Sequence, residues 1–224
     1  MRIGLDVAQH QLLWPELAAR VQFAEHAGFD GAWVFDHFKP LYGNPNGPCM
    51  EGWTLLAGLA AQTSRIRLGV LVTGVTYRHP SILAAEAVTI DHISKGRHYQ
   101  LEDAGYHPRP VQKPHPPIWI GAGGEQLMLP IVARRADAWH AFGSEQSMVA
   151  KSGLLDELAE KAGRDPKRIL RSASLSLSRP WDQVRRRATQ LRQAGFGYLI
   201  AEWPSEGKRR LDEFVEKVMP ALVG

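Results

Sequence analysis

Cysteine is almost absent from this sequence, which has a single thiol, Cys49, among 224 residues. One cysteine can form neither an intramolecular disulfide nor a Cys-based zinc site, so we expect a protein of a reducing, cytoplasmic compartment. Long apolar runs are also missing. The longest, residues 53–61, falls far short of the roughly 20 residues that span a bilayer, and the sequence therefore predicts no membrane insertion.

Charge is not concentrated in any one tract, although the net charge is +4. The densest basic clusters, residues 185–187 and 208–210, lie among helix-periodic residues, where a solvated helix face is the simplest interpretation. A contact between one of them and an anionic cofactor tail stays open, whereas nucleic-acid binding is not expected. The nine histidines form no H-E-x-x-H or H-x-H pair, so we expect no metal site.

Short β-type runs alternate with helix-periodic segments along the chain. Seven strands, each followed by a helix, predict a parallel sheet, and the length suits a single domain of residues 1–224. An open doubly wound sheet and a closed barrel both satisfy this pattern. The expected strands are residues 3–7, 32–35, 66–73, 117–121, 138–142, 169–177 and 197–201, and the expected helices are residues 14–27, 53–62, 80–93, 126–135, 147–162, 181–194 and 208–218.

The alternation is interrupted between residues 95 and 116. No helical period is found there, and the stretch contains Pro108, Pro110, Pro114 and Pro116. We expect a long proline-rich loop. Loops of this length inside a compact domain are usually functional, or they indicate that an element has been assigned wrongly.

The dipeptide Asp36-His37 directly follows an expected strand. In parallel α/β folds the carboxyl ends of strands are where ligands and catalytic groups gather. A histidine at such a position exchanges a proton near neutral pH, and a neighbouring carboxylate orients a partner. A turn-capping aspartate beside a packed histidine explains the same residues equally well.

A second candidate is the turn Gly121-Ala122-Gly123-Gly124, between an expected strand and an expected helix. Glycines at such a junction let backbone amides approach a phosphate. The spacing matches neither the dinucleotide fingerprint nor the P-loop, so a tight structural turn is an equal alternative. Further along the rim, Thr73, Tyr77, Arg78 and His79 indicate a pocket lining, with capping of the helix at Pro80 as the other explanation for His79.

Taken together, several stretches resemble the luciferase-like monooxygenase family, in particular its branch that uses coenzyme F420. They are FAEHAGFDGAWVFDHF, EGWTLLAGLAAQTSRIRLGVLVTGVTYRHP, TIDHISKGR, HPRPVQKPHPPIWIGAGGE and ARRADAWHAFG. The resemblance covers most of residues 1–145 and is specific because the pieces occur in this order. It implies a TIM-type (β/α)8 barrel that binds a flavin or deazaflavin at its C-terminal mouth.

The resemblance also implies roles for individual residues. Asp36 would contact the ring system and His37 would serve as proton donor or acceptor during hydride transfer. Leu71 and Val72 match a bulge that often carries a non-prolyl cis peptide supporting the ring, and Thr73 belongs to the same lining. Residues 121–124 match the loop that receives the cofactor phosphate. The expected cofactor is F420, with FMN as the alternative.

The sequence departs from the family after Arg97, where about fifty residues, including the fourth strand and helix, are missing by comparison with family length. We expect the exposed sheet edge to be covered by residues 98–102 or by the second subunit of a homodimer. Three functions remain open: an F420-dependent oxidoreductase acting on a small organic substrate, an FMN-dependent monooxygenase, and a shortened, non-catalytic flavin-binding protein.

Overall fold

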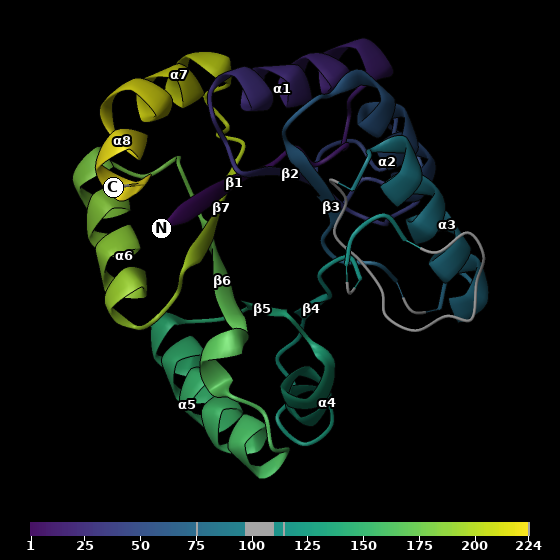
Figure 1. Ribbon diagram of the computed structural model, residues 1–224. Helices are drawn as coiled ribbons and strands as arrows, with labels where there is room; N and C mark the ends of the chain where they lie inside the picture. Colours follow the sequence, from purple (N-terminus) through teal and green to yellow (C-terminus); the bar gives the residue numbers. More distant parts are fainter. Residues whose placement is uncertain (75, 97–109, 114, 224) are drawn as a thin grey trace. The chain divides into compact units, whose positions relative to one another are not determined.

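The computed structural model describes residues 1–74, 76–96, 110–113 and 115–223 (Figure 1). These residues form two compact units, which we describe separately. Unit 1 contains Met1–Gly4 and Ile118–Gly224, and unit 2 contains Leu5–Pro117.

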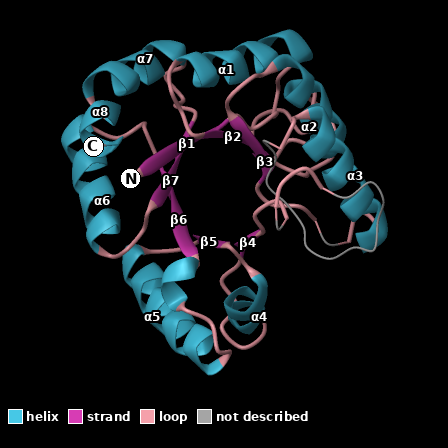
Figure 2. Ribbon diagram, viewed as in Figure 1, coloured by secondary structure: helices cyan, strands magenta, loops and turns pink. Residues whose placement is uncertain are grey.

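Unit 2 alternates strands with helices, and its first strand begins in unit 1. The helices lie on one face of the strands (Figure 2). The elements are β1 (Arg2–Asp6), α1 (Trp14–His26), β2 (Gly31–Val34), α2 (Gly52–Gln62), β3 (Arg67–Val70) and α3 (Pro80–Ile93).

Unit 1 continues the same alternation. Its elements are β4 (Trp119–Gly121), α4 (Met128–Arg135), β5 (Ala138–Ala141), α5 (Glu145–Lys161), the 3₁₀ turn η1 (Pro166–Arg168), β6 (Leu170–Leu175), α6 (Trp181–Gln193), β7 (Tyr198–Glu202), α7 (Lys208–Lys217) and α8 (Met219–Val223). The seven expected strands and the helix after each are therefore confirmed, most within two residues at each end, while η1 and α8 were not expected.

The strand order decides between the two architectures that the sequence left open. The order is β3-β2-β1-β7-β6-β5-β4, so the last strand lies beside the first, and the backbone N–H of Arg2 donates to the carbonyl of Gly197 at 3.0 Å. A doubly wound sheet places the first strand next to an internal one, whereas a barrel returns its last strand to the first. The topology is that of a TIM-type barrel whose edge strands are β3 and β4, where the fourth strand and helix would be inserted.

Local sequence signals explain where the helices begin and end. Helix α1 ends before Gly28, which adopts φ = +83°, a conformation that glycine reaches without steric cost. Helix α3 begins at Pro80, and the His79 side chain accepts a hydrogen bond from the Ser81 N–H. The capping interpretation of His79 is therefore confirmed.

Unit 1 contains a curled sheet. Trp119 on β4 and Tyr198 on β7 make an edge-to-face contact with ring centroids 5.0 Å apart, although β5 and β6 separate their strands. Side chains from strands so far apart in order meet only when the sheet curves toward one face. Both rings are buried on that concave face.

Unit 2 is held together partly by one carboxylate near the end of α1. The Glu25 side chain, near the end of α1, accepts hydrogen bonds from the backbone N–H groups of Ser64, Arg65 and Ile66. Burial raises the pKa of Glu25, but the three hydrogen bonds lower it by more. The pKa of Glu25 therefore lies below its ordinary value. The contact fixes the chain just before β3.

Among the described residues, no helix has both the length and the apolar character needed to span a bilayer.

Candidate functional site

The candidate residues of unit 2 follow the carboxyl ends of three adjacent parallel strands. β1 pairs with β2, and β2 pairs with β3, so the segments after Asp6, Val34 and Val70 leave the sheet along one edge. This is the edge at which ligands bind in parallel α/β folds. Asp36, His37 and residues 71–73 all lie there, as the sequence predicted.

Gln9 joins two of these segments. Its side chain is fully buried; its Oε1 accepts from the Phe35 N–H at 3.1 Å, and its Nε2 donates to the carbonyls of Phe35 and Met50. A buried amide with several partners has little freedom to move. Gln9 therefore fixes the backbone immediately before Asp36.

Asp36 is bound to Arg78. The carboxylate is 1% exposed and receives two guanidinium hydrogen bonds, at 2.6 and 3.1 Å, together with the Gly74 N–H at 3.1 Å. Bidentate pairing of this kind is strong and directional. Both oxygens are engaged, so Asp36 ties the chain that follows β2 to the chain that follows β3.

Arg78 also forms ion pairs with two glutamates, with nitrogen–oxygen distances of 2.9 Å to Glu51 and 3.3 Å to Glu86. Hydrogen bonding to Asp36, opposed by burial, raises the pKa of Arg78. Burial raises the pKa of Glu51, but hydrogen bonds from Thr54 and Trp53 and the charge of Arg78 bring it below the ordinary value. For Glu86, burial outweighs Arg78 and raises the pKa.

His37 has a different environment from Asp36. Its imidazole is only half-buried, and among the described residues it makes no hydrogen bond, while its ring lies 5.1 Å from that of Phe35. A second histidine, His10, stacks on Phe35 at 4.1 Å. Burial, together with the charge of His37, lowers the pKa of His10, and the His10 Nδ1 accepts a hydrogen bond from the Leu41 N–H at 2.9 Å.

Residues 71–73 leave the sheet directly after β3. The Leu71-Val72 peptide bond is cis, as the family resemblance implied. The Thr73 hydroxyl accepts a hydrogen bond from the indole of the buried Trp53 at 3.2 Å, and Val72 is exposed. The expected strand over residues 66–73 is shorter in the structure, because the chain after Val70 turns toward Asp36.

Exposed apolar side chains are concentrated in the segments that follow β2 and β3. Phe38 and Tyr77 come from different segments and lie 4.6 Å apart by ring centroid. Isolated exposed apolar residues are normal, but a group on one rim indicates a binding surface. The group, each member at least 38% exposed, consists of Phe38, Leu41, Tyr42, Val72 and Tyr77.

In unit 1, residues 121–124 connect β4 to α4. The carbonyl of Ala122 accepts a hydrogen bond from the Trp139 indole at 2.8 Å, which holds the start of the turn. Within the described part of the chain, the backbone N–H groups of Gly123 and Gly124 donate to no other group. Free amides at a strand-to-helix junction are suited to an anion.

A buried histidine that the sequence did not single out lies on β5. His140 is 1% exposed; its Nδ1 is 3.0 Å from the Ser172 hydroxyl and its Nε2 is 3.4 Å from that of Ser174. Burial lowers its pKa to about 4. His140 is therefore neutral at physiological pH, with both ring nitrogens facing hydroxyl groups of β6.

No group of three or more potential metal ligands occurs among the residues that the structure describes. Cys49 donates its thiol to the carbonyl of His37 at 3.4 Å, and burial raises its pKa. A protonated thiol is a poor nucleophile, so Cys49 contributes packing to this rim.

The sequence model of one family, described as luciferase-like monooxygenase, matches residues 2–98 and 95–213. The chain belongs to this family. The two matched segments overlap at residues 95–98, where the sequence predicts that an internal segment is missing.

Two relatives in this family illustrate its range. The F420-dependent hydroxymycolic acid dehydrogenase of Mycobacterium tuberculosis is 23% identical over 270 residues, covering 97% of this chain and 74% of the relative. The 4-hydroxyprotoasukamycin monooxygenase of Streptomyces nodosus subsp. asukaensis is 33% identical over 85 residues, which are 38% of this chain and only 22% of that relative. The first alignment is longer than the chain itself, so the mycobacterial family member has residues that this chain lacks.

Among solved structures, the coenzyme F420-dependent tetrahydromethanopterin reductase of Methanopyrus kandleri superposes with a TM-score of 0.82 at 16% identity, covering 99% of each chain. At this identity the likeness shows the fold alone. It agrees with a TIM-type family fold that lacks part of the barrel around the fourth strand-helix unit.

We predict that Arg78→Met lowers the free energy of unfolding by about 3 kcal/mol, because the buried carboxylate of Asp36 loses its cation. Urea unfolding followed by circular dichroism measures the change. Arg134→Met removes the same charge from the exposed face of α4 and is expected to stay within about 0.5 kcal/mol of the wild type. A loss below about 1 kcal/mol for Arg78→Met would contradict the structural role of the pair.

His140 gives a pH dependence of stability. Because its folded pKa of about 4 lies below the ordinary histidine value of 6.5, its contribution to stability is complete above pH 6.5 and is lost as the pH falls toward 4. The loss is about 3 kcal/mol at about 1.4 kcal/mol per pH unit. Urea unfolding at a series of pH values measures this loss. Between pH 6.5 and pH 4 the free energy of unfolding should fall by this much more for the wild type than for His140→Gln. Parallel curves for the two proteins would disprove the assignment.

Proposed function

We propose that this chain is an F420-dependent oxidoreductase that transfers a hydride between the deazaflavin and a small organic substrate. One arrangement in unit 2 carries the proposal. His37, with an imidazole free of hydrogen bonds among the described residues, directly follows the buried Asp36, which anchors Gly74 and Arg78. The buried Asp36 thus fixes the backbone before His37, and the half-buried His37 imidazole is available as a proton donor or acceptor.

The rim suits a planar ring system. Phe38, Leu41, Tyr42, Val72 and Tyr77 expose apolar surface there, and small-molecule sites are mostly apolar with a few placed polar groups. We assign Leu71, Val72 and Thr73 to ring support, and Asp36 to the same task through the segment that it holds. We assign the phosphate to Gly121, Ala122, Gly123 and Gly124, because the amides of Gly123 and Gly124 are free to donate.

A bound deazaflavin supplies the hydride chemistry, so the protein's contribution is orientation and proton management. His37 gives or takes a proton at an imidazole nitrogen as the substrate oxygen gains or loses charge. Asp36 does not take part in proton transfer, since both of its oxygens are occupied by Arg78 and Gly74. Its task is to keep the backbone before His37 in place.

An FMN-dependent monooxygenase is the second candidate, favoured by the relative named as a monooxygenase. The two cofactors share a tricyclic ring and a phosphate, so both fit an apolar rim and free amides. A small-molecule substrate and a cytoplasmic location belong to either proposal. Direct binding measurements separate them.

Titration of the purified protein with F420 and with FMN, read by fluorescence, tests the proposal. We expect selective binding of F420, followed by turnover of at least one compound in a panel of small alcohols, aldehydes and ketones. Selective binding of FMN would support the monooxygenase. Binding of neither would contradict both proposals and favour a shortened, non-catalytic protein.

Replacing His37 is expected to separate chemistry from binding. His37→Ala should slow hydride transfer by about 100-fold or more and leave the Kd for F420 within about twofold, because a proton-transfer group acts mainly on the chemical step. His26→Ala, on the exposed end of α1, is the matched control and should keep wild-type turnover. Unchanged turnover in His37→Ala would remove this residue from the mechanism.

We also propose that the chain forms a homodimer, because β3 and β4 are the edge strands among the residues that the structure describes and exposed edges are usually covered. Residues 98–102, the other cover predicted, lie outside the described residues. Light scattering measures the mass in solution, and hydrogen exchange measures the protection of residues 95–114. A strict monomer with rapid exchange throughout that stretch would show that neither residues 98–102 nor a second subunit covers the sheet edge.

A further inference from the structure

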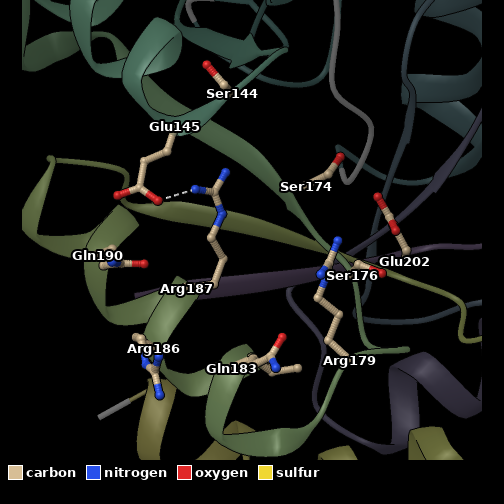
Figure 3. A pocket seen from close by; sticks show the side chains of 11 residues that line it. Ser144, Glu145, Ser174, Ser176, Arg179, Gln183, Arg186, Arg187, Gln190 and Glu202 are labelled. Atoms are coloured by element: carbon tan, nitrogen blue, oxygen red, sulfur yellow. Dashed lines mark hydrogen bonds and ion pairs between the residues drawn. The ribbon is translucent and has the colours of Figure 1, made fainter.

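Unit 1 contains a cavity of about 560 Å³ beside the carboxyl ends of three parallel strands (Figure 3). Ser144 follows β5, Ser174 and Ser176 lie at the end of β6, and Glu202 is the last residue of β7. The volume is that of a small-molecule site. Residues 121–124 leave β4 along the same edge of unit 1, but they do not line this cavity.

Three arginines line the cavity from its α6 side, and one of them, Arg186, pairs with Asp182 on the same helix. Figure 3 shows the guanidinium groups of Arg179 and Arg187 on two sides of one space. Arg187 pairs with Glu145 at the start of α5 through a single nitrogen, which leaves its other donors available. Arg179, just before α6, is exposed, and its guanidinium makes no hydrogen bond or ion pair with any described residue.

The loop that carries Arg179 is held in place by another residue. The Arg210 guanidinium lies 3.4 Å from the centre of the Trp181 ring and donates to the carbonyls of Leu177 and Arg179. These contacts fix the backbone on both sides of Arg179 while leaving its side chain free. A free cation on a fixed backbone is a preorganised anion contact.

Hydroxyl groups and the carboxylates of Glu145 and Glu202 line the rest of the cavity, together with Val184 and two glutamines. Ser144, Ser174 and Ser176 supply O–H donors, and the Ser176 hydroxyl makes no hydrogen bond within the described chain. A single arginine satisfies a carboxylate, whereas two guanidinium groups and several hydroxyls match the larger number of acceptors on a phosphate. Glu202 accepts from donors such as the hydroxyl groups of an attached polyol.

From this geometry we infer that the cavity binds the phosphate of a small hydroxylated phosphate ester. Arg179 and Arg187 neutralise the phosphate, the serine hydroxyls donate to its oxygens, and Glu202 accepts from a hydroxyl group of the ester. The assignment of this ester to the substrate, as opposed to the cofactor, rests on the proposed function. The phosphate site itself stands on the residues of unit 1 alone.

Isothermal titration of the full chain with glycerol 3-phosphate, inorganic phosphate and glycerol, at fixed ionic strength, tests the site. We expect both phosphates to bind and glycerol to give no signal. Arg179→Gln and Arg187→Gln should each raise the Kd for glycerol 3-phosphate by about tenfold or more, as expected for loss of a charged hydrogen bond. Arg179 has no partner to lose, so its variant keeps the test valid if Arg187→Gln unfolds.

Two further variants sharpen the test. Arg185→Gln removes the same charge from α6 outside the cavity and should change binding by less than twofold. Glu202→Gln should weaken the binding of glycerol 3-phosphate more than that of inorganic phosphate, because the Glu202 carboxylate contacts the hydroxyl group of the ester. The absence of phosphate binding, or an equal effect in Arg185→Gln and Arg179→Gln, would overturn the site.

F420 titration of the same variants separates the two possible sources of phosphate. Unchanged F420 affinity in Arg179→Gln, with F420 and glycerol 3-phosphate bound together, supports a substrate site. Competition between them, with F420 weakened by Arg179→Gln, would overturn that assignment in favour of the cofactor's own phosphodiester. If F420 fails to bind the wild type while the binding of glycerol 3-phosphate still depends on Arg179, the phosphate site stands and the proposed function fails.

Discussion

The ion pair between Asp36 and Arg78 is the constraint on which the candidate site of unit 2 depends. It joins the segment after β2 to the segment after β3, and the Gly74 N–H reinforces the link. A buried carboxylate is costly without a partner, so the two segments keep this arrangement whenever the unit is folded. His37 and residues 71–73 take their positions from it, and the apolar rim is assembled as a consequence.

The fold was predictable because each element carries its own local signal. Period-two runs located the strands, period-3.6 runs located the helices, and Gly28 and Pro80 marked helix ends correctly. Periodicity did not choose between an open sheet and a barrel, since that choice depends on which strands pair across the chain. The hydrogen bond between Arg2 and Gly197 joins strands that are distant in sequence and leaves no local signal. Helix α8 was missed because its five residues are too few to show a period.

The candidate site was predictable only in part, for the same reason. Asp36 and His37 stand out because they follow a strand directly, and residues 121–124 stand out by composition. Partners distant in sequence leave no local signal: Asp36 and Arg78 are 42 positions apart, and His140 meets Ser172 across 32. The cavity of unit 1 was likewise hidden, because the basic run at residues 185–187 has the pattern of a solvated helix face.

A crystal structure of the chain with F420 bound tests the central claim most directly. We expect the deazaflavin ring to lie against residues 71–73 and the His37 imidazole to point toward the ring or the substrate beside it. The ion pair of Asp36 and Arg78 should be unchanged. Density for the ring away from these residues, or Asp36 released from Arg78 to contact the ring itself, would contradict the claim that a closed ion pair builds the site.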